Sequence, residues 1–131
     1  MRATWYSQRE ENGVETYCVR IARQEFVEIY PETVITGKYY ILDPNGNLLI
    51  LPGFEWDGAS GPAIDCKSNM RASMVHDCLY GMISRRELRP KGWHRKRADL
   101  LFRKMLVKDG MSSFRAWYYW LGVRAAGWRH C

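Results

Sequence analysis

The sequence predicts an α+β fold, with N-terminal antiparallel β-hairpins followed by a C-terminal part of three helices. Before residue 52 the chain is rich in alternating, β-branched and aromatic residues, which favour strands. After residue 68 its apolar residues recur at spacings of three and four, which favours helices. The chain has 131 residues, 47% of them hydrophobic, so we expect a single domain over residues 1–131 with one core.

The first half, residues 1–52, is expected to contain mainly strands. Residues 16–21 and 25–30 alternate between apolar and polar side chains, and residues 34–42 are rich in β-branched and aromatic ones. The following stretch DPNGN has a proline and an Asn-Gly pair, which mark a tight turn. Residues 48–51 then return as a strand, so this segment predicts a β-hairpin.

A Gly/Pro loop is expected over residues 53–67. The stretch PGFEWDGASGP, which starts at Pro52, has three glycines and two prolines and therefore favours irregular, close-approaching backbone. Asp57 in this loop has two interpretations, since it could hydrogen-bond local backbone amides or bind a ligand.

Residues 68–126 are expected to be helical. Ser68 can N-cap a first helix that ends near residue 83. A basic loop over residues 85–93 follows, and then a second helix over residues 95–108. The second helix has a buried stripe formed by Ala98, Leu101, Phe102, Met105 and Leu106.

A third helix is expected to reach about residue 126, with Ser112 or Ser113 as its N-cap. Asp109-Gly110 ends the helix before it, because glycine suits the left-handed cap conformation. The third helix is crowded with tryptophan and tyrosine. Such residues are typical of a core, and beside arginines they also suit a membrane surface.

The charge of the chain favours an anionic partner. There are 20 Lys and Arg against 14 Asp and Glu, which gives a net charge of +6. A phospholipid, a nucleic acid and an acidic protein surface all fit this charge. We expect no transmembrane segment and no signal peptide, because no apolar run has the length or position for either. The four cysteines form no CxxC pair, which favours reduced thiols.

The stretch MVHDCLY places an adjacent His76-Asp77 pair inside the first helix. His76 and Tyr80 are four residues apart and share a face, while Asp77 points about 100° away. If the first two helices pack antiparallel, Asp99 can face His76. A carboxylate bonded to one ring nitrogen makes the other nitrogen a better general base.

Several interpretations of this pair are open. Asp77 could join Asp57 and loop carbonyls in an oxygen-rich site that suits Ca²⁺. The His76–Asp99 network could instead be structural and join the helices to the loop. A nucleophilic triad of Ser60, His76 and Asp99 and a zinc site are weaker alternatives. The zinc ligands would come from His76, Cys78, His94 and His130.

Three motifs resemble a family of uncharacterised proteins of tailed bacteriophages and prophages. They are GFEWDGASGP, HDCLY and RADLLF, in this order. The resemblance covers roughly residues 34–127. It implies a phage accessory protein that acts in the host cytoplasm or in the virion.

The HDCLY helix, with an aspartate on the next helix, resembles the helical hairpin of secreted phospholipases A₂. The resemblance implies a calcium-dependent phospholipid esterase in which His76 is the general base, Asp99 orients it and Tyr80 supports the network. It also implies calcium ligands, namely Asp57, Asp77 and the loop carbonyls near Gly58 and Ser60. The alternative function is a non-enzymatic virion or host-interaction protein that binds its partner through the basic surface.

Overall fold

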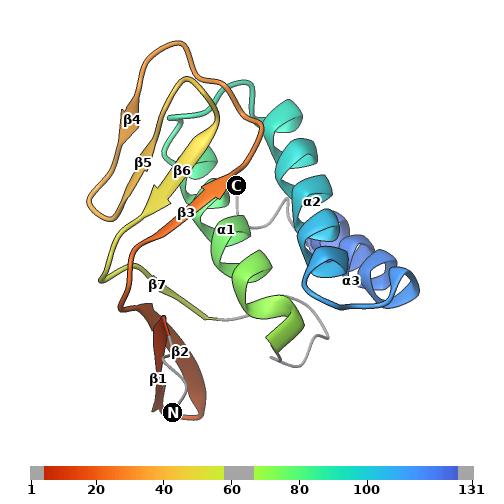
Figure 1. Cartoon of the computed structure of the whole chain (residues 1–131). Coiled ribbons are helices and arrows are strands. Elements are labelled where there is room, and N and C mark those ends of the chain that lie inside the picture. Colours follow the sequence, from red (N-terminus) through yellow and green to blue (C-terminus); the bar gives the residue numbers. More distant parts are fainter. Residues whose placement is uncertain (1–4, 58–66, 127–131) are drawn as a thin grey trace. The chain divides into compact units, whose positions relative to one another are not determined.

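The computed structural model describes residues 5–57 and 67–126. They belong to two compact units, Met1–Asp57 and Gly58–Cys131, and each unit is described by itself. The first contains all the strands and the second all the helices of the described chain (Figure 1). This arrangement confirms the α+β class with antiparallel strands first and three helices afterwards. The expectation of a single domain stays a prediction.

The strand unit contains two antiparallel sheets. The first has the strand order β1-β2-β7 and the second has the order β3-β6-β5-β4. The strands are β1 (Tyr6–Glu11), β2 (Val14–Val19), β3 (Arg23–Phe26), β4 (Ile35–Thr36), β5 (Tyr40–Leu42), β6 (Asn47–Ile50) and β7 (Glu55–Trp56).

The predicted hairpin is confirmed as β5 and β6. One oxygen of the Asp43 carboxylate accepts the backbone N–H groups of Asn45 at 2.9 Å and Asn47 at 3.0 Å. These bonds, that from Asn47 above all, lower the pKa of Asp43. Gly46 has φ +86°, a left-handed conformation that glycine adopts without strain. Leu42 and Leu48 pair across the hairpin and are fully buried.

Two strand predictions were wrong in extent. The strand expected over residues 25–30 ends at Phe26, because Glu28 has φ +57°. The alternation continues beyond Phe26 because Val27 and Ile29 are buried without belonging to the sheet. The segment 34–42 forms two short strands, since the chain turns where the N–H of Gly37 donates to the carbonyl of Tyr40.

Two further strands, β1 and β7, were not predicted. β7 is only two residues long and lies inside the expected Gly/Pro loop, where it pairs with β2. Its Trp56 is buried and stacks on Trp5 with ring centroids 5.8 Å apart. The pairing of β7 with β2 depends on residues distant in sequence, so no local pattern indicates it.

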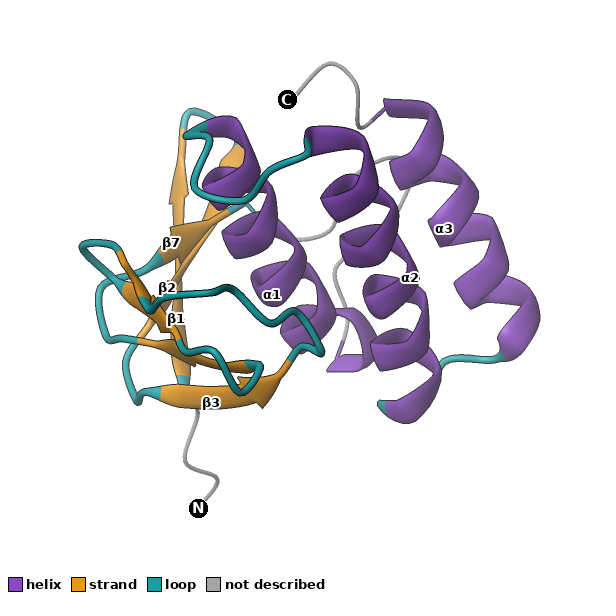
Figure 2. Cartoon of the chain, turned by 90° about the horizontal axis from the view of Figure 1, so that it is seen from above, coloured by secondary structure: helices purple, strands orange, loops and turns teal. Residues whose placement is uncertain are grey.

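The helical unit contains α1 (Lys67–Ser84), α2 (Lys91–Lys108) and α3 (Ser113–Ala126). The helices lie side by side with α2 between α1 and α3 (Figure 2). α1 and α2 run in opposite directions (Figure 1), so the predicted antiparallel hairpin is confirmed.

The start of α2 corrects the prediction. The helix begins at Lys91 rather than near residue 95, and Pro90 occupies the N-cap position in an extended conformation. The basic loop is therefore confined to residues 85–90. Proline is compatible with a helix start, because it lacks the N–H that the first turn cannot bond. Ser112 caps α3, since its Oγ accepts the N–H of Arg115 at 3.3 Å.

An ion pair connects the first turns of α1 to the end of α2. The Nε and Nη2 atoms of Arg71 donate to the two carboxylate oxygens of Asp109, both at 2.9 Å. Both side chains are mostly buried. Two parallel charge-assisted bonds of this kind are stronger than a single surface ion pair.

Replacing Asp109 with asparagine should therefore lower the free energy of unfolding by about 1–3 kcal/mol, because one charge of a partly buried pair is lost. Urea denaturation followed by circular dichroism measures this change. Glu55→Gln is the control, since its pair with Arg9 is exposed and 3.4 Å long, and a change below about 0.5 kcal/mol is expected. Equal losses in the two variants would contradict the role assigned to the Arg71–Asp109 pair.

Candidate functional site

Asp99 is the centre of a buried hydrogen-bond network within the helical unit. Its side chain has 0% exposure, and one oxygen lies 2.7 Å from the Nε2 of His76. The same oxygen accepts the hydroxyl of Tyr80 at 2.6 Å. The other oxygen accepts the Nη1 of Arg124 at 2.8 Å. The network joins α1, α2 and α3, since each helix contributes at least one of these residues.

The position of each group follows from the helix geometry. His76 and Tyr80 are one turn apart on α1 and present their side chains to the same side. Their rings are in contact, with centroids 4.1 Å apart. Asp99 faces them from the middle of α2, and Phe102, one turn later on that helix, packs its ring 4.9 Å from that of His76. The antiparallel hairpin therefore brings these four side chains together.

Asp99 is a carboxylate in this network. Burial by itself would raise the pKa of Asp99, but the bonds from His76, Tyr80 and Arg124 outweigh burial and lower it. Burial and the bond to Asp99 raise the pKa of Tyr80, so its hydroxyl keeps the proton that it donates. A carboxylate can only accept, so the Nε2 of His76 must be the donor.

The tautomer of His76 follows from this assignment. In the neutral ring the proton lies on Nε2, so the lone pair lies on Nδ1. Within the described part of the chain, the bond to Asp99 is the only side-chain hydrogen bond of His76. The bond to Asp99 therefore fixes the orientation of the ring and places the lone pair of the neutral form on Nδ1.

Of the other predicted site residues, the structure describes Asp77 and Asp57. Asp77 follows His76 on α1 and is half-buried, with interactions of its own. Asp57 is exposed and belongs to the strand unit. Gly58 and Ser60 lie outside the described residues, and so does the triad that would use Ser60.

The described residues do not provide a metal site. In residues 5–57 and 67–126, no group of three or more His, Cys, Asp or Glu side chains could hold an ion. The calcium site expected from Asp57, Asp77 and the loop carbonyls therefore stays a prediction. The weaker zinc alternative includes His130, which lies outside the described residues. Its His94 instead places Nε2 3.3 Å from the carbonyl oxygen of Arg89.

Arg124 belongs to the network and was not predicted. It comes from the last turn of α3, and its guanidinium supplies the positive charge next to the Asp99 carboxylate. An aspartate on the buried side of a helix requires a polar or charged partner, so the sequence indicates that a partner of Asp99 exists. The sequence does not say which of many arginines is the partner, because that depends on how α3 packs on α2.

A comparison with known protein families shows the family to which the chain belongs. The model of a family described as "Protein of unknown function (DUF1353)" matches residues 34–123. The chain belongs to the DUF1353 family. The DUF1353 match includes His76, Tyr80 and Asp99 and ends one residue before Arg124. No curated protein and no solved structure matches the chain significantly. The expected membership of an uncharacterised family is thus confirmed, while its phage association stays a prediction.

No helix among the described residues is long and apolar enough to cross a bilayer. Cys18 and Cys78 are free thiols, as expected. Cys78 lies in α1 next to Asp77 and is buried, which raises the pKa of its thiol. A thiol in this state is a poor nucleophile.

Proposed function

We propose that the chain is a hydrolase of phospholipid-like carboxylic esters, with His76 as its general base. The observation that supports this most is the 2.7 Å bond from the Nε2 of His76 to the ionised Asp99, since it orients the ring and leaves Nδ1 as an acceptor. The likeness of the HDCLY hairpin to that of secreted phospholipases A₂ supports the substrate class.

The proposed reaction uses this network in two proton transfers. The Nδ1 of His76 accepts a proton from a water molecule as the water oxygen attacks the ester carbonyl carbon. Asp99 stabilises the imidazolium that forms, without accepting its proton. When the bond between the carbonyl carbon and the alcohol oxygen breaks, Nδ1 returns the proton to that oxygen. The products are a carboxylic acid and an alcohol, and His76 is again neutral.

Tyr80 and Arg124 are positioning residues in this proposal. Both bond to Asp99 and hold its carboxylate in place, and neither bonds to His76. Arg124 also helps to keep Asp99 ionised, which is the state that can orient the His76 ring.

The test is hydrolysis of a short-chain phosphatidylglycerol by the purified protein, followed as released acid in a pH-stat. Parallel samples contain calcium chloride or EDTA, and the melting temperature is measured in both. We expect hydrolysis in calcium, and a calcium-dependent rise in melting temperature if the ion binds the folded state. If the protein neither hydrolyses the phospholipid nor shows a calcium-dependent thermal shift, the proposed esterase function is wrong.

The second candidate function is a non-enzymatic phage protein of the virion or host cytoplasm that binds an anionic partner. It is supported by a separation of charge between the two units. Residues 58–131 have 15 Lys and Arg against 5 Asp and Glu, a net charge of +10. Residues 1–57 have 5 against 9, a net charge of −4. Binding of the protein to sedimented phosphatidylglycerol vesicles or to a labelled nucleic acid, without hydrolysis in the pH-stat, would favour this candidate.

A further inference from the structure

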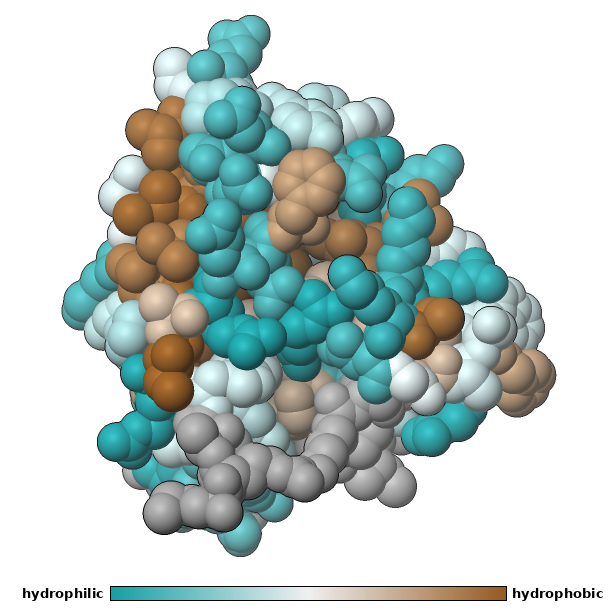
Figure 3. Space-filling model, in the orientation of Figure 1, coloured by the Kyte–Doolittle hydropathy of each residue, from teal (hydrophilic) through white to brown (hydrophobic). Residues whose placement is uncertain are grey.

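The outer face of α3 is apolar and exposed. Its side chains Phe114, Trp117, Tyr118 and Leu121, here called the outer stripe, are 73%, 41%, 50% and 39% exposed. They occur at i, i+3, i+4 and i+7, so they line one side of the helix. On the face drawn in Figure 3, hydrophobic residues reach the surface at the right-hand edge, where Figure 1 shows α3.

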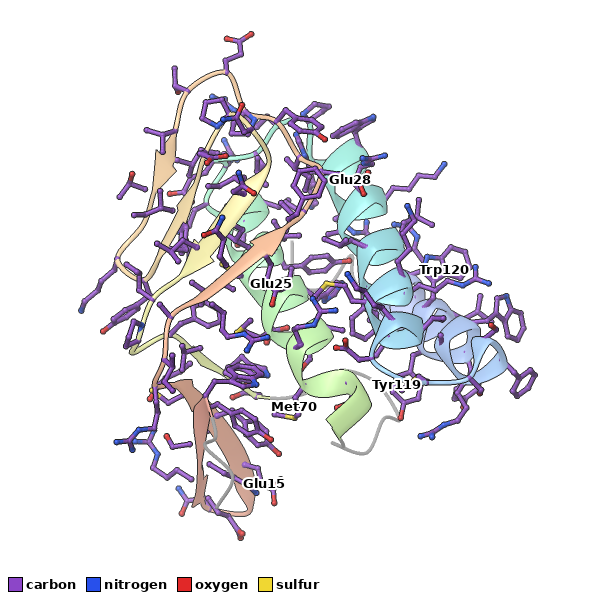
Figure 4. The ribbon with its side chains drawn as sticks, in the orientation of Figure 1. Glu15, Glu25, Glu28, Met70, Tyr119 and Trp120 are labelled. Atoms are coloured by element: carbon purple, nitrogen blue, oxygen red, sulfur yellow. The ribbon has the colours of Figure 1, made fainter. Side chains whose placement is uncertain are left out.

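The opposite face of α3 is apolar as well. Ala116, Tyr119 and Val123 are buried and Trp120 is half-buried, and Figure 4 labels Tyr119 and Trp120. These residues follow the same spacing, two positions after the outer stripe. A helix at the surface of a protein usually has one polar face, whereas a helix that is apolar all round is covered on both sides. The outer stripe therefore has the character of an interaction surface.

The charges around α3 indicate which partner this surface fits. The helix has no acidic residue, and Arg115 is exposed beside the outer stripe. On the neighbouring α2, Arg103 lies with its guanidinium 5.6 Å from the ring of Trp120. Residues 58–131 have a net charge of +10, which favours an anionic partner for this unit.

We propose that the outer stripe docks on an anionic phospholipid surface, with α3 lying in the plane of the interface. Tryptophan and tyrosine prefer the headgroup level of a bilayer, because one end of the ring system is apolar and the other is polar. Apolar side chains on one side of a helix and cations beside them are the features that hold an interfacial helix on anionic lipid. Leu121 has no ring, so it fits an acyl layer better than a stack of nucleic-acid bases.

Docking and the buried network share α3. The helix that presents the outer stripe also carries Arg124, which bonds to Asp99 on its other side. The proposal rests on the proposed esterase function for its choice of lipid as the partner. Docking on lipid would then bring the helical unit that contains His76 to the surface where its substrate lies.

The test is flotation of the full chain with vesicles of equal parts phosphatidylglycerol and phosphatidylcholine. It uses a His76→Asn background, so that loss of docking and loss of hydrolysis are separate results. The triple variant Phe114→Gln/Trp117→Gln/Leu121→Gln should lower partitioning onto these vesicles by about tenfold or more. All three side chains are exposed, so the fold should persist, and circular dichroism checks this. Trp93→Gln is the control, because Trp93 on α2 is a tryptophan that is more exposed than Trp117, 52% against 41%, and the partitioning of this variant should not change.

Three results would overturn the proposal. The first is equal partitioning of the triple variant and the His76→Asn parent. The second is binding of a single-stranded oligonucleotide that the triple variant loses, with no binding of vesicles by the parent. The third is a dimer of the parent in light scattering that becomes a monomer in the triple variant, since a second copy of the chain would then cover the outer stripe.

Discussion

Replacing His76 with asparagine is expected to lower ester hydrolysis by about 10²–10⁴-fold, the usual contribution of a positioned general base. Asparagine keeps a polar group near Asp99 but has no basic nitrogen, so it cannot accept the proton of the attacking water. The loss should fall on kcat, because the proposed role of His76 lies in the reaction step and not in substrate binding. Initial rates over a range of short-chain phosphatidylglycerol concentrations measure kcat and KM separately.

His94→Asn is the matched control for this variant. Among the described residues, His94 is the second buried histidine of the helical unit, and its Nε2 faces a backbone carbonyl rather than a carboxylate. Its replacement should leave kcat within a few-fold of that of the parent chain, once the folded fraction is taken into account. If the two variants lose activity equally, or if His76→Asn keeps full activity, His76 is not the base.

Replacing Asp99 with asparagine should produce the largest loss of stability, about 3 kcal/mol in the free energy of unfolding. The change leaves the positive charge of Arg124 without its counter-ion. It also places a neutral amide where two buried donors, His76 Nε2 and the Tyr80 hydroxyl, point. Removal of one member of a buried ion pair typically costs 3–5 kcal/mol, and the low end applies because the Arg124 side chain keeps 32% exposure. Urea denaturation measures the loss, and Asp109→Asn should lose less, because the Asp109 carboxylate is 22% exposed whereas that of Asp99 is fully buried.

The Asp99→Asn substitution should also change how the free energy of unfolding depends on pH. The folded state lowers the pKa of Asp99, so its ionisation stabilises the fold fully above the unfolded-state pKa, near ~3.9. That stabilisation disappears as the pH falls through the lower pKa of the folded state. The parent chain should therefore lose stability on acidification below about pH 5, and Asp99→Asn should lose less. Parallel curves for the two proteins would show that Asp99 does not titrate as assigned.

Local patterns in the sequence determined several features that the structure confirms. The DPNGN stretch predicts its hairpin because the Asp43 side chain and Gly46 act within the turn itself. The apolar spacing predicts the helices for the same reason, since residues one turn apart share a face whatever surrounds them. His76 and Tyr80 could be placed side by side on this basis. Asp99 could be placed opposite them once the two helices were taken to pack antiparallel.

Features that depend on distant residues were decided only by the tertiary structure. The short strand β7 exists because it pairs with the edge of β2. The strand predicted over residues 25–30 was too long, because alternation of apolar and polar residues reports burial rather than sheet pairing. The bond from Arg124 to Asp99 depends on how α3 packs on α2, since 25 residues separate the two in sequence. The exposure of the outer stripe has the same origin. The aromatic residues of α3 are equally apolar on both faces, and only packing decides which face is buried.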